Sequence, residues 1–252
     1  MKDKPKIIIG TAMYKRPILT NVVFDYYKDM IVRMSNVVDI CFISCGSEGD
    51  TSKNLTEKNG FEYIEHPNTP LSQKNNALFN GLKNKGFDFF IFIGSDDLIN
   101  DNIILKYIEY YEKGYDYGGL LDFKFVSPNG SFYWPGYSSH RKGEPIGGGR
   151  FFSKKLLTKL NWNPWGGSEI NYGLDGVLTN SVERHNINKF TLIGRGVGCD
   201  LLTIRGGLSI TNMNRLPNLI RITNPLDNIV MDVNKVSKML EGGEYNNVFK
   251  ND

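Results

Sequence analysis

The residues best suited to chemistry are two adjacent acids, Asp96 and Asp97, which follow an unbroken apolar run. The run covers residues 89–93 and reads Phe-Phe-Ile-Phe-Ile, and a Gly-Ser pair separates it from the acids. Apolar residues without alternation predict a strand that is buried on both faces, as in the middle of a parallel sheet. In open α/β sheets, ligands bind beyond the carboxyl ends of such strands. We therefore expect both acids to lie at a ligand site.

Two carboxylates in such a place need a cation or hydrogen-bond donors nearby, because they repel each other and lose solvation. A divalent ion that carries a diphosphate would meet this need, since hard cations bind carboxylate and phosphate oxygens. The alternative is structural: Asp96, Asp97 or Asn100 would cap a helix that starts near Asp101.

Length and composition indicate an ordinary globular protein. The 252 residues suit one α/β domain with a sizeable core, and 40% hydrophobic and 23% charged residues are typical of soluble domains. The net charge of +3 is too small to indicate nucleic-acid binding by itself. Arg141-Lys142 and Arg150, with three lysines at 154, 155 and 159, could form a basic face, although a solvated surface is the favoured explanation of such clusters.

Cysteine usage and the N-terminus predict a reducing, cytoplasmic location. The three cysteines are odd in number and lack the spacing of zinc ligands. No apolar segment of the kind found in signal peptides follows residues 1–6. No apolar segment approaches the length that spans a bilayer.

Strands and helices alternate in the first half of the sequence. We predict strands at 6–10, 37–45, 61–65 and 89–93, and helices at 16–34, 69–85 and 103–113. This alternation with short connections predicts a parallel sheet. After Gly114 the pattern changes: we predict strands at 117–126, 131–134, 190–193 and 200–204, helices at 153–160, 172–185 and 226–240, and a long loop at 137–149.

Polar motifs follow these elements in a particular order. They are Gly-Thr-Ala-Met-Tyr-Lys-Arg-Pro at 10–17, an acidic loop at 46–50, Ser-Gln-Lys-Asn-Asn at 72–76, Ser-Asp-Asp at 95–97, Trp-Asn-Pro-Trp at 162–165 and Gly-Leu-Asp-Gly at 173–176. This order resembles that of the GT-A fold glycosyltransferases, most closely the family-2-like enzymes, over residues 6–205. The look-alikes include short phage or bacterial reading frames.

The resemblance implies an α/β fold of the GT-A, Rossmann-like kind: a mixed, mostly parallel sheet flanked by helices. Residues 1–115 would bind a nucleotide-sugar donor. Residues 116–252 would form the acceptor half of the same domain and end in a helix.

The resemblance also implies donor-binding roles in the first half. Thr11, Tyr14 and Arg16 would hold the nucleotide; a tyrosine can stack on a base and an arginine can pair with phosphate. Glu48, or Asp50 in the same loop, would recognise the base.

Lys74 and Asn75 match a basic-Asn pair that contacts the donor in this family, at a helix start whose dipole favours phosphate. A surface role for Arg16 and a solvated Lys74 are the competing interpretations.

In the Ser95-Asp96-Asp97 motif, the resemblance implies that Asp97 binds a metal directly and that Asp96 contacts ribose or metal-bound water. Mn²⁺ or Mg²⁺ would neutralise the departing nucleoside diphosphate, a large electrostatic term in such reactions. No histidine of this sequence lies in a motif that matches the family's third ligand, so water would complete the coordination.

Asp175 matches the acid that deprotonates the acceptor in inverting members, and Glu169 is the fallback. An N-terminal helix cap is the competing role for Asp175. Gly148 and Gly149 would form the floor of the sugar pocket, where glycine lets the backbone approach the sugar. Trp165, like Trp134 and Trp162, is a candidate platform for sugar stacking, with core packing as its alternative.

The sequence thus predicts a metal-dependent glycosyltransferase that uses a nucleotide-diphosphate sugar, with a UDP-sugar as the favoured donor and Asp175 as the base of an inverting reaction. A nucleotidyltransferase is one alternative, although residues 10–14 are poor in the glycine that such enzymes need there. A non-catalytic carbohydrate- or nucleic-acid-binding protein is the other. The acceptor would be a saccharide or a modified DNA base, and a DNA acceptor predicts activity that falls steeply with salt.

Overall fold

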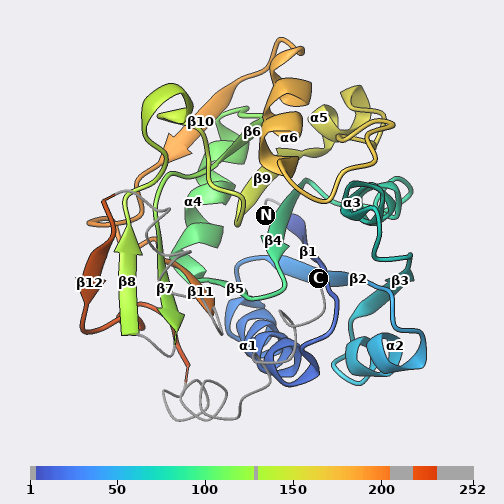
Figure 1. Cartoon of the computed structure of the whole chain (residues 1–252), viewed down its shortest axis with the longest axis horizontal. Coiled ribbons are helices and arrows are strands. Elements are labelled where there is room, and N and C mark those ends of the chain that lie inside the picture. The colour runs from blue at the N-terminus through green and yellow to red at the C-terminus, as the bar shows by residue number, and fades with distance from the viewer. Residues whose placement is uncertain (1–3, 128–129, 205–217, 232–252) are drawn as a thin grey trace.

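Two β-sheets form the centre of the computed structural model, which describes residues 4–127, 130–204 and 218–231 (Figure 1). The first sheet has the strand order β10-β6-β9-β4-β1-β2-β3. Its strands are β1 (Lys6–Ala12), β2 (Asp39–Gly46), β3 (Glu62–Glu65), β4 (Phe89–Gly94), β6 (Tyr117–Leu120), β9 (Arg150–Ser153) and β10 (Lys189–Leu192).

Strands β3, β2, β1 and β4 run parallel, and β9 is inserted antiparallel between β4 and β6. Strand β10 is parallel to β6. This arrangement confirms the predicted mixed, mostly parallel α/β sheet. It also shows that the chain beyond residue 116 contributes strands to the same sheet as the first half.

The second sheet is smaller and mostly antiparallel, with the order β12-β8-β7-β11-β5. Its strands are β5 (Asp97–Ile99), β7 (Phe123–Ser127), β8 (Gly130–Trp134), β11 (Leu201–Ile204) and β12 (Ile220–Ile222). Only two residues, Ser95 and Asp96, separate the end of β4 from the start of β5 in the other sheet, so the chain passes between sheets at the predicted acidic motif.

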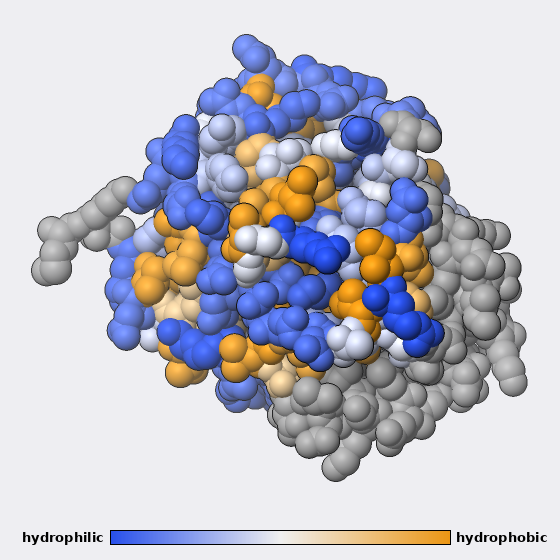
Figure 2. Space-filling view, turned by 90° about the vertical axis from the view of Figure 1, so that its left-hand side faces the viewer, coloured by the Kyte–Doolittle hydropathy of each residue, from blue (hydrophilic) through white to orange (hydrophobic). Residues whose placement is uncertain are grey.

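Helices cover both faces of the first sheet. They are α1 (Pro17–Met34), α2 (Asp50–Glu57), α3 (Leu71–Asn80), α4 (Asp101–Glu112), α5 (Lys154–Lys159) and α6 (Leu174–Glu183). Side chains alternate along a strand, so Ile7 and Ile9 of β1 pack with α1, α4 and the second sheet, whereas Ile8 packs with α3, α5 and α6. On the side of the molecule toward β12 and β8, hydrophobic residues form separate groups among hydrophilic ones (Figure 2).

Several sequence predictions of elements were wrong. The predicted strand at 117–126 is two strands in different sheets, because Asp122 turns the chain between them by accepting hydrogen bonds from the backbone N–H groups of Gly194 and Arg195. Helix α2 and strands β5, β9 and β12 were not predicted. The described part of the predicted helix at 226–240 is a turn followed by irregular chain, and residues 232–240 lie outside the described residues.

Helix α1 holds the short strand β5 in place through two buried hydroxyls. Tyr26 donates to the carbonyl oxygen of Ile99 at 2.7 Å. Tyr27 donates to the carbonyl oxygen of Asp97 at 2.9 Å and accepts from the N–H of Ile99 at 3.2 Å. A three-residue strand has little stability of its own, so these bonds fix where the acidic motif lies.

Replacing Tyr27 by Phe should lower the free energy of unfolding by roughly 1–3 kcal/mol, because it leaves two buried backbone groups of β5 without this partner. Urea unfolding measures the loss. Tyr172→Phe is the control, since that side chain is 85% exposed and should change stability little. Equal stability of the Tyr27→Phe variant and the wild type would mean that α1 does not anchor β5.

Candidate active site

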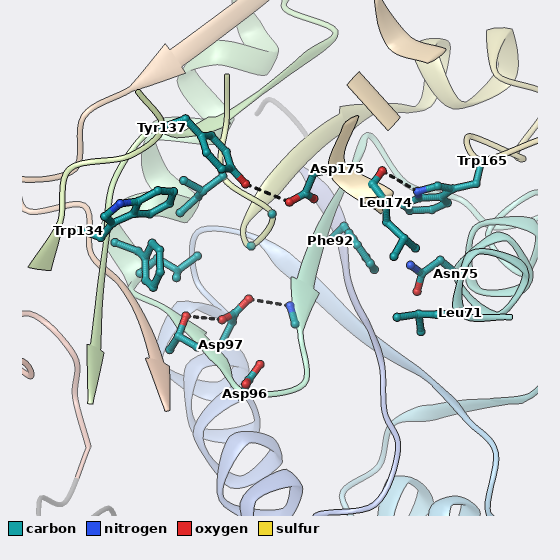
Figure 3. Close-up of a pocket in the computed structure, with 17 residues that line it drawn as sticks. Leu71, Asn75, Phe92, Asp96, Asp97, Trp134, Tyr137, Trp165, Leu174 and Asp175 are labelled. Atoms are coloured by element: carbon teal, nitrogen blue, oxygen red, sulfur yellow. Dashed lines mark hydrogen bonds between the residues drawn. The ribbon is translucent and has the colours of Figure 1, made fainter. Parts of the chain in front are cut away.

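A cavity of about 490 Å³ opens between the two sheets at the carboxyl end of β4 (Figure 3). Its walls are mainly apolar and aromatic, with three carboxylates among them. The lining residues are Leu71, Asn75, Phe92, Gly94, Asp96, Asp97, Phe123, Trp134, Tyr137, Ile146, Gly147, Gly148, Trp165, Leu174, Asp175, Leu201 and Thr203. Seven of the residues that the sequence analysis proposed for the site therefore share this cavity: Asn75, Asp96, Asp97, Trp134, Gly148, Trp165 and Asp175.

Asp97 is buried at the boundary of the two sheets and is held on both carboxylate oxygens. The N–H of Gly94, in β4, donates to Oδ2 at 2.8 Å, and the hydroxyl of Thr203, in β11, donates to Oδ1 at 2.6 Å. Asp97 and Thr203 are also paired in the antiparallel register of β5 and β11. These donors stabilise the charged form, which a buried carboxylate needs.

Gly147 and Gly148 lie between Asp97 and Asp175. A Cβ on Gly148 would lie 2.3 Å from Oδ2 of Asp97, and a Cβ on Gly147 would lie 3.1 Å from Oδ1 of Asp175. Glycine at 148 is therefore required for the carboxylate to approach the backbone this closely. The predicted role of glycine at the pocket floor has this geometric basis at Gly148. Gly149 does not line the cavity, and its carbonyl accepts from the hydroxyl of Tyr107 at 2.6 Å.

Asp96 joins the cavity to the loop after β1. Nη1 of Arg16 donates to its Oδ2 at 3.1 Å, while Nη2 donates to the hydroxyl of Ser95 at 2.6 Å. Arg16 and Lys15 both have left-handed backbone conformations, with φ of 57° and 53°. Such conformations are uncommon for residues other than glycine, so the loop is held in this shape by its surroundings.

The loops after β1 and β2 meet beside this ion pair. The N–H of Lys15 donates to Oε2 of Glu48 at 2.8 Å. Tyr14 is 40% exposed, so its ring can be reached by a ligand. Thr11 is buried inside β1, and its hydroxyl has no hydrogen-bond partner among the described residues. These residues lie outside the cavity lining, so the donor-binding roles predicted for them remain predictions.

Lys74 is completely buried, and its ammonium connects three loops at the carboxyl ends of the first strands. It donates to the carbonyl oxygen of Met13, to the hydroxyl of Ser47 at 3.0 Å and to Oδ1 of Asn68 at 3.1 Å. Burial lowers its pKa to about 8. Its three donor positions are thus engaged by protein, so its contact with a donor remains a prediction. In this structure it supports the loops around the site.

Helix α3 brings Asn75 to the cavity and holds the chain segment that follows Trp165. The hydroxyl of Ser72 donates to the carbonyl oxygen of Ser168 at 2.5 Å. The amide of Asn76 donates to the carbonyl oxygen of Gly166 at 2.9 Å. Oδ1 of Asn75 is buried without a hydrogen-bond partner among the described residues, which leaves an acceptor for a ligand at the cavity wall.

The tryptophans differ in their surroundings. Trp165 lines the cavity, and its indole N–H donates to the carbonyl oxygen of Leu174 at 3.0 Å. Trp134 lines the opposite side (Figure 3). Trp162 is not part of the lining and packs edge-on against Phe87 with ring centroids 6.2 Å apart.

Asp175 lies in the first turn of α6 and faces the cavity. Its Oδ2 accepts from the hydroxyl of Tyr137 at 3.0 Å, and its Oδ1 lies 3.3 Å from Nη2 of Arg150. The helix cap position is Gly173, which has no side chain, so Asp175 does not occupy it. Glu169 is exposed and is not part of the lining.

Sequence analysis missed three residues of this site: Thr203, Tyr137 and Arg150. Arg150 was assigned to a basic surface cluster, and this assignment was wrong, because the side chain is completely buried at the start of β9. The sequence did contain a signal of this burial, since Arg150 directly precedes the apolar pair Phe151 and Phe152, as expected for the first residue of a buried strand. Thr203 and Tyr137 gave no signal beyond their place in a predicted strand and loop.

Asp96 and Asp97 could supply some, but not all, of the ligands of a hard divalent cation. Asp96 and Asp97 offer oxygen ligands at one edge of the cavity, as Mn²⁺ and Mg²⁺ prefer. Within residues 4–127, 130–204 and 218–231, no group of three or more His, Cys, Asp or Glu side chains is placed to hold a metal. A cation bound through one or two carboxylates would take its other ligands from phosphate and water, a common arrangement for Mg²⁺.

No protein-family model matches the sequence, and no curated protein matches it. Solved structures of TarS from S. aureus do match the fold. For TarS 1–349 the TM-score is 0.59 at 13% identity, over 96% of this chain and 71% of that chain. For TarS 1–349 in complex with UDP the TM-score is 0.58 at 12% identity, over 93% of this chain and 69% of that chain.

A longer TarS structure matches with a TM-score of 0.57 at 12% identity over 81% of this chain, which spans 37% of the length of that chain. A weaker likeness, with a TM-score of 0.48 and 14% identity, is to 4-diphosphocytidyl-2C-methyl-D-erythritol synthase from Anaerococcus prevotii, and it is too low to bear on function. The likenesses to TarS show that the chain has a GT-A type α/β fold. Across the described part of the chain, no helix is both long and apolar enough to span a membrane.

Replacing Lys74 by Met should flatten the dependence of stability on pH above pH 8. The pKa of Lys74 is about 8 in the folded chain and 10.5 without burial. Between these values the unfolded chain binds more protons, so this group makes the wild type more stable as the pH rises. The difference in unfolding free energy between wild type and variant should grow by at most about 1.4 kcal/mol per pH unit.

Urea unfolding of both proteins at several pH values across this window measures the difference. Lys53→Met, at an exposed position of α2, is the control and should follow the wild type. If the wild-type and Lys74→Met curves run parallel, burial does not lower the pKa of Lys74.

Proposed function

We propose that this chain is a metal-dependent glycosyltransferase that moves a sugar from a nucleotide-diphosphate sugar to an acceptor hydroxyl. The observation that carries the proposal is the single cavity that Asp96, Asp97 and Asp175 line together. Asp96 and Asp97 follow β4, where ligands bind in open α/β sheets. Asp175 comes from a different segment and lies beyond Gly147 and Gly148. The two acids at one end of the cavity would bind the donor diphosphate through a divalent cation. The acid at the other end would accept the proton of the acceptor hydroxyl.

The nucleotide would lie over the loops after β1 and β2. Tyr14 would stack on the base, and Glu48 would accept a hydrogen bond from it. Arg16, which contacts Asp96 at the cavity edge, would pair with phosphate through its fork of donors. UDP is the favoured nucleotide, which agrees with the crystal structure of TarS in complex with UDP.

The sugar would occupy the apolar cavity. Trp165 and Trp134 offer flat surfaces for its ring, and the unpartnered Oδ1 of Asn75 offers an acceptor for one of its hydroxyls. Gly148 allows the backbone to approach it. The cavity volume of about 490 Å³ is within the usual range for small-molecule sites.

In the reaction, Asp175 would accept the proton of the acceptor hydroxyl, whose oxygen then bonds to the anomeric carbon as the bond to the diphosphate breaks. This single displacement inverts the anomeric centre. Asp96 and Asp97 would hold Mn²⁺ or Mg²⁺, which supplies positive charge to the departing nucleoside diphosphate when bound. Arg16 would add a second positive charge near the phosphates. The acceptor would be a saccharide or a modified DNA base.

A melting-temperature screen with UDP, GDP, CMP and dTDP, each with and without Mn²⁺, tests the proposal. A ligand that binds only the folded chain raises the melting temperature. A rise that needs both one nucleotide and the metal is the expected result. A chain that no nucleotide stabilises in the presence of Mn²⁺ would contradict the proposal and favour a non-catalytic binding protein. A nucleotidyltransferase would instead release pyrophosphate from a nucleoside triphosphate.

Replacing Asp97 by Asn should abolish the stabilisation by UDP that depends on Mn²⁺. At a UDP concentration about 100 times the dissociation constant, the wild type should gain about 2.7 kcal/mol. The variant should gain almost nothing, because the charge that attracts the cation is gone. Its own melting temperature should also fall modestly, since Thr203 and Gly94 lose a charged acceptor.

Asp101→Asn is the matched control, since Asp101 pairs with Arg33 on the surface, away from the cavity. It should keep the full response to UDP and Mn²⁺. An undiminished response in the Asp97→Asn variant would exclude Asp97 as the metal ligand.

Replacing Asp175 by Asn should preserve the response to UDP and Mn²⁺ but reduce turnover by roughly 10²–10⁴-fold, the usual contribution of a general base. Release of UDP from a panel of UDP-sugars, with water or an added saccharide as the acceptor, measures turnover. Glu169→Gln is the control and should behave like the wild type. The opposite pattern, with the loss at Glu169, would move the base to that residue.

A further inference from the structure

Arg150 is a buried cation to which the sequence assigned no part in the site. It begins β9, the strand between β4 and β6, and its side chain has no exposed surface. Its Nε donates to the carbonyl oxygen of Ile146 at 2.9 Å, and its Nη2 donates to that of Pro145 at 3.0 Å. A charge taken out of water in this way is costly unless an opposite charge accompanies it.

Asp175 provides that opposite charge. Its Oδ1 lies 3.3 Å from Nη2 of Arg150, and this is the ion pair that Arg150 makes within the described part of the chain. The Asp175 side chain is 37% exposed, so the pair joins a buried guanidinium to a carboxylate that faces the cavity. In such a pair the carboxylate is held from behind while its outer side remains open to a ligand.

Tyr137 holds the other oxygen of Asp175, as Figure 3 shows. Burial, and next the charge of Asp175, raise the pKa of Tyr137 to about 12, so its hydroxyl stays protonated and donates. The guanidinium of Arg141 stacks on the Tyr137 ring at 3.7 Å and pairs with Glu144 at 2.9 Å. The two carboxylate oxygens of Asp175 are therefore held by different segments, β9 and the loop before it.

We propose that Arg150 is a positioning residue for Asp175. The buried guanidinium supplies the countercharge of the carboxylate and, together with Tyr137, sets the direction in which Asp175 faces the acceptor hydroxyl. This inference rests on the proposed function, in which Asp175 takes the proton of the acceptor.

The same contacts connect Arg150 to the floor of the cavity. The carbonyl groups that it binds belong to Pro145 and Ile146, directly before Gly147 and Gly148. These glycines separate Asp175 from Asp97. Arg150 thus also contacts the loop that separates the acid of the acceptor side from the acid of the metal side. A purely structural role in this loop is the competing explanation that an experiment must separate.

The test is a double-mutant cycle that combines Arg150→Lys, Arg150→Met and Tyr137→Phe with Asp175→Asn. Turnover is UDP release from UDP-glucose, UDP-galactose or UDP-N-acetylglucosamine, whichever the wild type cleaves fastest. If Arg150 acts through Asp175, each Arg150 variant should lower kcat at least about tenfold in the wild-type background and little further in the Asp175→Asn background. The KM for the donor and the response to UDP and Mn²⁺ should stay unchanged.

The pH dependence of turnover separates positioning from a merely structural role. Arg150→Met should move the acid limb of the pH–rate profile to higher pH, whereas Arg150→Lys, which keeps a charge, should move it less. The charged and titratable groups around Asp175 are Arg150, Tyr137 and Arg141 behind it, with Tyr117 on β6. None of these others is changed in the Arg150 variants. In thermal unfolding, the losses caused by Arg150→Lys and Asp175→Asn should be less than additive, which checks that the two side chains interact in the folded chain.

Equal loss of turnover in both backgrounds, or loss of the response to UDP and Mn²⁺, would overturn the inference and leave Arg150 a structural residue. If Arg150→Met does not fold, Arg150→Lys and Tyr137→Phe complete the cycle. Wild-type turnover in Asp175→Asn would refute the base assignment in the proposed function. Inactive Asp175→Asn together with fully active Arg150→Lys and Arg150→Met would refute the role of Arg150 alone.

Discussion

The hydrogen bonds to the Asp97 carboxylate are the contacts on which the rest of the site depends. Gly94 donates from the end of β4 in the first sheet, and Thr203 donates from β11 in the second. One buried charge therefore ties the two sheets together where the chain crosses between them. Removing a donor would leave a buried carboxylate oxygen without a hydrogen bond, which would destabilise the folded chain. This tie holds the end of β4 and strand β11 together at the wall of the cavity.

Charge is distributed around the cavity as acids facing inward with cations behind or beside them. Arg16 lies beside Asp96 at the edge that we assign to the nucleotide, and buried Arg150 lies behind Asp175 at the other end. Each cation compensates an acid while leaving part of that acid exposed to the cavity. The apolar walls between them lower the local dielectric, which strengthens the interaction of a bound ligand with each charged group. The same walls exclude water that would compete with an acceptor hydroxyl.

Sequence predicted the parts of the fold that carry a strong local pattern. The apolar runs of β1, β2 and β4 and the position of Asp96 and Asp97 after β4 needed no knowledge of distant residues. Strands β5, β9 and β12 are three or four residues long, too short for a periodic signal, and they form only by pairing with distant chain. The partnership of Asp97 with Thr203 spans 106 residues, so local composition could not indicate it. Arg150 looked like a surface cation because its countercharge is also remote in sequence.

A crystal structure of the chain grown with UDP and Mn²⁺, with anomalous diffraction recorded for manganese, tests the central claim most directly. Our account predicts a manganese peak in contact with Asp96 or Asp97, the diphosphate beside it at the cavity edge, and the uracil over Tyr14. A well-ordered UDP at another place on the molecule, or manganese bound away from both acids, would contradict it.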